Sequence, residues 1–139
     1  CVPVLGLSER DVILSPLPLF HSYALNFCVL SALAVGATEH ILERYSTQEV
    51  MAQLATGEYT VMPGVPTMFH YLMEGGKADP AFAMRGMRLC ISAGAILPGT
   101  LTRAFEARFG IPLLDGYGIT ETSTFVTMNA PHATRLDGS

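Results

Sequence analysis

Short apolar runs recur along the chain, and proline, glycine or polar residues separate one run from the next. Such runs predict buried strands, because a strand covered on both faces of a sheet carries apolar side chains at nearly every position. The predicted strands cover residues 10–16, 38–42, 59–62, 88–92, 112–114 and 125–128. Pro63-Gly64 is expected to stop the third of them.

Longer periodic segments between these runs predict helices. The segment Tyr23–Val35 is apolar on all sides and stops at Gly36, as expected for a buried helix that ends in a glycine cap. Ser46-Thr47-Gln48-Glu49 has the pattern of a capping box, in which the serine oxygen accepts from a free backbone N–H. We therefore expect a second helix to begin at Ser46.

Two further helices are predicted to begin at prolines, because a proline needs no backbone N–H in the first turn. The helix at Pro66 should end at Gly75-Gly76, and the helix at Pro98 should end at Gly110. Strands and helices thus alternate with short links, which is typical of right-handed βαβ units. We expect one α/β subdomain over residues 1–139, with three layers and a mostly parallel sheet.

Composition narrows the classes of partner. Half of the 139 residues are hydrophobic and 14% are charged, against a usual share of about 25%, so we expect other polypeptide to cover part of the surface. The net charge of -4 offers no basic field for a phosphate backbone, which argues against a nucleic-acid partner. The most apolar stretch, residues 23–37, is shorter than the roughly 20 residues of a transmembrane helix.

The cysteines favour a reducing compartment. Cys1, Cys28 and Cys90 are odd in number and widely spaced, which fits neither a disulfide framework nor a zinc pattern. A cytoplasmic location is therefore the prediction.

The densest group of candidate chemistry is Asp115-Gly116-Tyr117-Gly118-Ile119-Thr120-Glu121-Thr122, predicted as a loop after the strand at 112–114. Ligands of parallel sheets bind beyond the carboxyl ends of the strands. Glycine lets backbone approach a ligand, a tyrosine face can stack on a base, a threonine can donate to phosphate, and a glutamate can hold Mg²⁺. A simple turn would explain an isolated Gly-Tyr-Gly, but eight such residues in succession favour an adenine-to-phosphate site.

This run resembles the tyrosine-glycine-x-threonine-glutamate motif of the adenylate-forming superfamily, which contains acyl-CoA and aryl-CoA ligases, peptide-synthetase adenylation domains and beetle luciferases. Two other segments resemble family motifs in the family's order. Ser92–Pro98 is similar to the segment that flanks the adenine and the acyl pocket, and Pro18–Tyr23 resembles the segment at the mouth of the acyl site. The resemblance covers residues 11–129, and it departs at Ile96, where many relatives have proline.

The resemblance implies a ligase that works in two steps. A carboxylic acid attacks the α-phosphate of ATP to give acyl-AMP and pyrophosphate, and a thiol, usually coenzyme A, then displaces AMP. ATP, Mg²⁺, coenzyme A and a small carboxylic acid are thus the implied cofactors and substrates. The family's phosphate loop and its C-terminal lid domain match no segment here, so we expect an internal part of the large N-terminal domain, inactive without the remainder of its enzyme.

Roles for single residues are also implied by the resemblance. Thr120 and Glu121 are implied as catalytic residues, Thr120 at the α-phosphate and Glu121 as the Mg²⁺ ligand. The implied nucleotide-binding residues are Gly94, Ala95, Asp115, Gly116, Tyr117, Gly118 and Thr120. The implied substrate-binding residues are His21, Tyr23, Ala93, Gly116 and Ile119. Core packing is the competing explanation for His21, as for any lone histidine in an apolar stretch.

Several alternatives stay open at the level of sequence. A peptide-synthetase-type adenylation domain would use the same residues but pass its acyl group to a carrier-protein thiol. A non-catalytic nucleotide-binding α/β module is the alternative from a different class, and assembly as a homodimer is also open. The apolar segments at 20–30 and 65–69 hint at a medium or long acyl chain, as in fatty acid metabolism, or at an aromatic acid.

Overall fold

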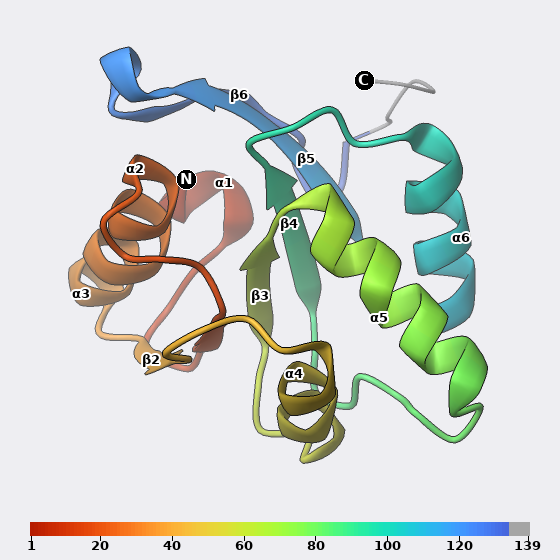
Figure 1. The fold of residues 1–139 in the computed structure, drawn as a ribbon. Helices are drawn as coiled ribbons and strands as arrows, with labels where there is room; N and C mark the ends of the chain where they lie inside the picture. The colour runs from red at the N-terminus through yellow and green to blue at the C-terminus, as the bar shows by residue number, and fades with distance from the viewer. Residues whose placement is uncertain (134–139) are drawn as a thin grey trace.

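The computed structural model describes residues 1–133, which form one six-stranded sheet with helices around it (Figure 1). The strand order is β2-β1-β3-β4-β5-β6; strands β1 to β5 are parallel, and β6 runs antiparallel to β5. The strands are β1 Val12–Ser15, β2 Thr38–Ile41, β3 Val61–Gly64, β4 Leu89–Ala93, β5 Leu113–Ile119 and β6 Thr124–Met128. The predicted α/β fold with a mostly parallel sheet is confirmed.

Helices cover both faces of the sheet. The helical segments are α1 Val2–Leu5, α2 Ser22–Ala24, the π-helix η1 Leu25–Leu30, α3 Ser31–Val35, α4 Thr47–Ala55, α5 Pro66–Ala78, α6 Gly99–Phe109 and the 3₁₀ turn η2 Thr120–Thr122. Figure 1 shows α1 and the run α2-η1-α3 on one side, and α4, α5 and α6 on the other. Ser46 caps α4 as predicted, its Oγ accepting from the Glu49 N–H at 3.4 Å.

Alternation along the strands builds a separate core on each face. Successive side chains of a strand point to opposite sides, so Ile13 packs under α1 to α3 while Leu14 packs under α4 to α6. In the same way, Leu114 packs in the core with Ile13 and Leu113 packs in the core with Leu14. Both faces of the sheet are therefore buried, which explains why the strands appear in the sequence as nearly continuous apolar runs.

The parallel strands bring distant loops to one edge of the sheet. The chain leaves the carboxyl ends of β1 and β4 through residues 16–21 and 94–98, and the hairpin of β5 and β6 turns at 120–123. In Figure 1 the tip of this hairpin lies over α2. All three segments of the predicted site therefore meet at the carboxyl edge, as the sheet topology requires.

Helix α5 does not end at its paired glycines, so that prediction is wrong. It continues through Gly75 and Gly76 to Ala78. A Cβ on Gly75 would collide with the sulfur of Met51 in α4, and one on Gly76 would lie 3.3 Å from the Phe109 ring in α6. These glycines let three helices pack closely, a tertiary requirement that looks like a stop signal in the sequence.

Two strands end later than predicted, β3 because it is shifted along the chain by two residues and β5 because it is longer. Strand β3 includes Pro63 and Gly64, whose Cα atoms pair with Ile91 and Ser92 of β4. The residues 115–119, predicted as loop, belong to β5 because β6 pairs with them from Gly116 to Ile119. The glycine-rich motif therefore stands on a strand and the short turn after it, and not on a free loop.

The helical segment from 22 to 35 is not buried on all sides, which corrects the prediction for it. Its inner stripe, including Phe27 and Cys28, is fully buried, whereas Leu25, Leu30 and Leu33 are exposed, Leu33 by 74%. These exposed leucines agree with the low charge content of the chain. Within the described residues, no helix has the length and apolar character needed to cross a membrane.

A partly buried ion pair, in which Asp11 is buried and Arg88 is partly exposed, ties the N-terminal segment to the amino ends of the strands. Arg88 donates from Nε to Asp11 Oδ1 at 2.7 Å and from Nη2 to Oδ2 at 2.9 Å, and its Nη1 donates to the Leu5 carbonyl at 2.9 Å. Burial would raise the pKa of the Asp11 carboxyl, but hydrogen bonds from Arg88, Thr60 and the Ser8 N–H outweigh it, so the pKa lies below its ordinary value of 3.8. The ionised carboxyl is thus stabilised in the folded state.

Arg88→Met is expected to destabilise the fold by about 2–4 kcal/mol at neutral pH, because it leaves the Asp11 charge buried without its partner. A carboxyl with a lowered folded pKa contributes stability above its unfolded pKa and loses it as the pH falls through the folded value. The gap between wild type and variant should therefore narrow below about pH 4. Urea unfolding of the complete polypeptide against pH measures both effects, and a gap that stays constant with pH would point to lost packing instead.

Candidate functional site

A cavity of about 320 Å³ opens at the carboxyl edge of the sheet. It lies between the start of α2, the end of β4 and the tip of the β5–β6 hairpin. Its lining residues are His21, Ser22, Tyr23, Ala93, Gly94, Gly118, Ile119, Thr120, Glu121, Thr124 and Phe125. Eight of the residues implied by the sequence are thus brought together, although they come from three segments far apart in the chain.

His21 and Ser22 place polar groups at this cavity. His21 caps α2, and its Nδ1 accepts from the Tyr23 N–H at 3.2 Å. In a neutral ring the proton then sits on Nε2, which leaves that nitrogen as a donor. The Oγ of Ser22 lies 3.4 Å from the Oγ1 of Thr120, so hydroxyls from two sides of the cavity meet.

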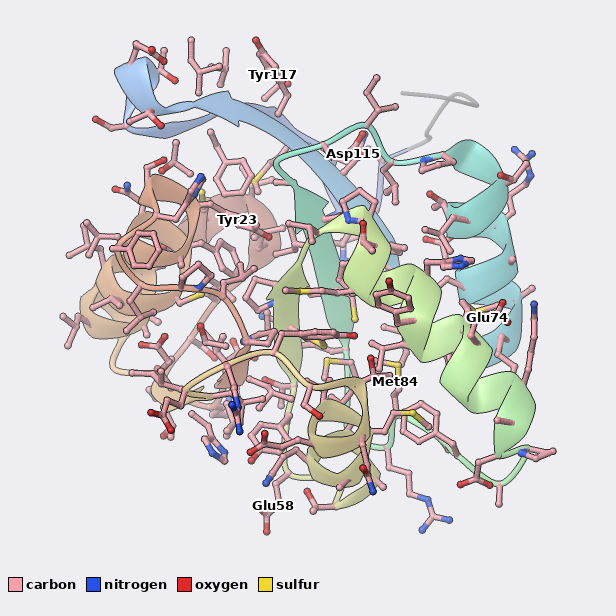
Figure 2. The ribbon with its side chains drawn as sticks, viewed as in Figure 1. Tyr23, Glu58, Glu74, Met84, Asp115 and Tyr117 are labelled. Atoms are coloured by element: carbon pink, nitrogen blue, oxygen red, sulfur yellow. The ribbon has the colours of Figure 1, made fainter. Side chains whose placement is uncertain are left out.

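Tyr23 contributes a ring edge and not a free hydroxyl. Its side chain is buried between the α2–α3 layer and the sheet (Figure 2), and its hydroxyl donates to the Ile91 carbonyl at 2.9 Å. The ring meets that of Phe125 edge to face, with 5.3 Å between centroids. Burial raises the pKa of the Tyr23 hydroxyl well above its ordinary value. Any contact with a ligand would therefore be apolar.

The segment after β4 divides between two hollows. Ala93 is the last residue of β4, and Gly94 turns the chain with a φ of 84°, a conformation that favours glycine. Both line the cavity, whereas Ala95 and Ile96 line a neighbouring groove between α5 and α6. Ile96, at the position that departs from the family pattern, is 91% exposed.

Three residues of the motif stand on β5 outside the lining of the cavity. Tyr117 is 60% exposed and points away from the body of the protein (Figure 2), so a face of its ring is accessible. Gly116 is covered by Phe125, and a Cβ there would collide with that ring. Asp115 is half-buried, its N–H donates to Asn129 Oδ1 at 3.0 Å, and burial raises the pKa of its carboxyl.

The turn η2 carries the two residues implied as catalytic. Thr120 and Glu121 are both exposed at the tip of the hairpin and line the cavity. Among residues 1–133, no three histidine, cysteine, aspartate or glutamate side chains group closely enough to hold a metal ion by themselves. Mg²⁺ is commonly held by one or two carboxylates together with substrate phosphates, so the lone Glu121 carboxylate fits Mg²⁺ only beside a bound phosphate.

Ser22, Thr124 and Phe125 line the cavity but were not identified as site residues from the sequence. Ser22 directly follows His21, so a hydroxyl next to the motif histidine was the available signal. Thr124 and Phe125 lie beyond the motif, and only the pairing of β6 with β5 turns them toward the cavity.

Comparisons with known proteins fit this geometry. The family of AMP-binding enzymes matches over residues 1–139. The chain belongs to this family. The resemblance to adenylate-forming enzymes and the α/β fold expected from it are thereby confirmed.

Among curated AMP-binding enzymes, the benzoate–CoA ligase of Thauera aromatica is 37% identical over 120 residues, which cover 86% of this chain and 23% of that protein. A benzoate CoA ligase structure from Burkholderia xenovorans LB400 has a TM-score of 0.85 and 34% identity, covering 96% of this chain and 27% of that one. An anthranilate CoA ligase solved with anthranoyl-AMP has a TM-score of 0.88 and 27% identity, covering 99% and 27%. The chain spans about a quarter of the length of these relatives.

Proposed function

We propose that the polypeptide containing this chain is an acyl-CoA ligase. It would activate a compact carboxylic acid with ATP and transfer the acyl group to coenzyme A. The observation that supports this best is the meeting of His21, Gly94, Thr120 and Glu121 around one cavity. The CoA ligases among the relatives support the same reaction class.

In the first step, a carboxylate oxygen of the acid attacks the α-phosphorus of ATP, and the bond to the bridging oxygen breaks as pyrophosphate leaves with its electron pair. Both reactants are anionic, so the site must orient them and offset their repulsion. His21 Nε2 and the hydroxyls of Ser22 and Thr120 are side-chain donors on residues that line the cavity. We assign them to the carboxylate and α-phosphate oxygens, and no nucleophilic side chain is needed.

The adenine is proposed to stack on the accessible ring of Tyr117, with the backbone of Gly94 and Ala95 on the other side. Aromatic rings bind flat bases in this way. Gly116 and Gly118 leave the neighbouring backbone free of side-chain bulk, and Asp115 is assigned to the same nucleotide site by resemblance. Of these residues, only Gly94 and Gly118 line the cavity, so the proposed adenine site lies mostly beside the space for the acid.

Glu121 is proposed as the protein ligand of Mg²⁺ at the tip of the hairpin. When bound there, Mg²⁺ supplies positive charge against the phosphate oxygens. The chain's own contribution is to hold an exposed carboxylate next to the Thr120 hydroxyl in one 3₁₀ turn. The carboxylate therefore lies in the same short segment as the Thr120 hydroxyl, which is proposed to donate a hydrogen bond to the phosphate.

In the second step, the thiol of coenzyme A attacks the acyl carbonyl and AMP leaves. We assign the phosphate loop and the mobile lid domain, which this step and nucleotide binding require in the family, to the remainder of the polypeptide. Residues 1–139 are accordingly proposed as one subdomain that is inactive alone. Cys28 and Cys90 are buried free thiols, in the cores on opposite faces of the sheet, which supports the proposed cytoplasmic location.

The acid is proposed to be compact and flat. Phe125 fills the space above Gly116 and packs against Tyr23 and Phe27, with ring centroids 5.3 Å and 6.2 Å away. Tyr23 and Phe125 therefore form an aromatic wall on the hairpin side of the cavity, which favours a flat acid over a long alkyl chain. The relatives named for benzoate and anthranilate also favour an aromatic acid over the long acyl chain that the sequence had left open.

The complete reaction tests this proposal. The complete polypeptide is incubated with ATP, Mg²⁺, coenzyme A and either benzoate-sized acids, long-chain fatty acids or amino acids. We expect AMP and an acyl-CoA thioester to form together, and only with compact carboxylic acids. Pyrophosphate release that depends on an amino acid, with no acyl-CoA formed when coenzyme A is supplied, would instead point to a carrier-protein acceptor and contradict the ligase.

A further inference from the structure

The turn that carries Thr120 and Glu121 contains strained backbone. Ser123 and Thr124 both have positive φ angles, 59° and 118°. A β-branched residue rarely adopts such a conformation, because its side chain crowds the neighbouring carbonyl groups. Strain of this kind persists only where surrounding contacts hold it, and it gathers at functional sites.

Two contacts hold Thr124 in this conformation. Its side chain is buried, with 6% exposure, and its Oγ1 donates to the Ser22 carbonyl at 2.8 Å. On its other side, the Thr124 carbonyl lies so close to Gly118 that a Cβ there would collide with it. The Thr124 hydroxyl therefore holds the hairpin tip to α2, and close packing of the Thr124 carbonyl on Gly118 holds it to β5.

The Ser22 carbonyl is itself fixed from within the helix. Besides a backbone N–H at the end of α2, it accepts from Asn26 Nδ2 at 2.9 Å, and the Asn26 carbonyl accepts from Ser31 Oγ at 3.0 Å. The latter bond joins Asn26, inside the π-helix η1, to Ser31 at its C-terminal cap. π-Helical turns are often found at functional sites. The acceptor for Thr124 thus stands at one end of a hydrogen-bonded series that runs through the irregular part of this helix.

This series ends beside two hydroxyls of the cavity. Ser22 Oγ and Thr120 Oγ1 lie 3.4 Å apart, on the two segments that Thr124 joins. Without the bond from Thr124, nothing else among the described hydrogen bonds connects the hairpin tip to the start of α2 apart from this hydroxyl pair itself. Phe125 also packs on Tyr23 beside this point, but Thr124 supplies the hydrogen bond that sets the position of Thr120 and Glu121 relative to Ser22.

We propose that Thr124 is a positioning residue for adenylation, whose hydroxyl holds the Thr120–Ser123 turn against α2 so that Thr120 and Glu121 face the bound acid and nucleotide. This inference rests on the proposed function. Thr124 acts through the turn and needs no contact with the substrates. Its role goes beyond the family motif, which ends before it.

Three variants of the complete polypeptide test the proposal. Thr124→Val keeps the shape and the β-branched strain but removes the donor, Thr124→Ser keeps the donor, and Thr127→Val is a matched control at an exposed position of β6. We expect Thr124→Val to lower the kcat of acid-dependent ATP–pyrophosphate exchange by about tenfold, the effect of about one lost hydrogen bond, with little change in the KM for the acid. Thr124→Ser and Thr127→Val should stay close to wild type.

Amide hydrogen exchange of residues 119–123 provides a readout that does not depend on activity. Thr124→Val should accelerate exchange in this turn at least several-fold, and Thr124→Ser should not, because only the former frees the turn. The proposal is overturned if Thr124→Val leaves the protection of the turn unchanged, if its kcat is that of wild type, or if Thr124→Ser is equally slow. If the wild-type enzyme catalyses ATP–pyrophosphate exchange with none of the acids, the proposed function is wrong. The amide hydrogen exchange would still decide whether Thr124 holds the turn.

Discussion

Glu121→Ala is expected to lower Mg²⁺-dependent acyl-AMP formation by roughly a hundredfold to a thousandfold, the size of effect seen when one group that stabilises transition-state charge is removed. The variant should fold normally, because Glu121 is exposed and makes no hydrogen bond or ion pair with other residues in the range 1–133. Glu121→Gln should behave like the alanine variant, since an amide keeps the shape of the side chain but not its charge.

The matched control for Glu121 is Glu58→Ala. Glu58 is an exposed glutamate at the opposite end of the sheet from the cavity (Figure 2), and its loss should leave the rate unchanged. The rate of acyl-AMP formation is measured as the rate of pyrophosphate release, at saturating ATP and over a range of Mg²⁺ concentrations. Near-normal rates in Glu121→Ala at all Mg²⁺ concentrations would remove Glu121 from the metal site.

Gly118→Ala is expected to destabilise the fold by about 2–3 kcal/mol and to abolish most of the activity. A Cβ at this position would collide with the carbonyl group of Thr124, which is backbone and cannot swing away as a side chain could. Strand β6 would have to shift, and the turn with Thr120 and Glu121 would shift with it. Denaturant unfolding and acyl-AMP formation, both measured on the complete polypeptide, report the two effects separately.

Gly110→Ala separates the collision at Gly118 from a general cost of losing glycine. Gly110 has a φ of 69° at the end of α6, and its missing Cβ would meet nothing within 4 Å. This control should lose about 1 kcal/mol from backbone strain and keep its activity. If Gly118→Ala were no worse than Gly110→Ala in both measurements, the close packing of β6 on β5 would be wrong.

Much of the fold could be predicted because its signals are local. The apolar runs mark the strands, Pro66 and Ser46 mark helix starts, and Gly36 and Gly110 adopt the left-handed caps expected of them. The errors arise where packing between elements decides how far a helix or strand extends. Gly75 and Gly76 look like a stop but serve a contact between helices. The extension of β5 through Ile119 requires a partner strand that local pattern does not reveal.

The candidate site was partly predictable for a similar reason. Parallel strands bring their carboxyl ends to one edge, so His21, Gly94 and Thr120 were expected to meet, and they line one cavity. The direction of each side chain was not predictable. Tyr23 turns its hydroxyl into the core toward the Ile91 carbonyl. Thr124 reaches Ser22, 102 positions away in the chain, only because of a turn with positive φ angles.

The central claim is that the cavity at the hairpin tip belongs to an adenylation site for a compact carboxylic acid. The measurement that tests it most directly is exchange of labelled pyrophosphate into ATP by the complete polypeptide, with Mg²⁺ and without coenzyme A. Benzoate-sized acids, long-chain fatty acids and amino acids are supplied one at a time. The account predicts exchange that depends on Mg²⁺ and on a compact acid, with little or none for long-chain fatty acids. Equal exchange with all acids, or no exchange with any of them, would contradict it.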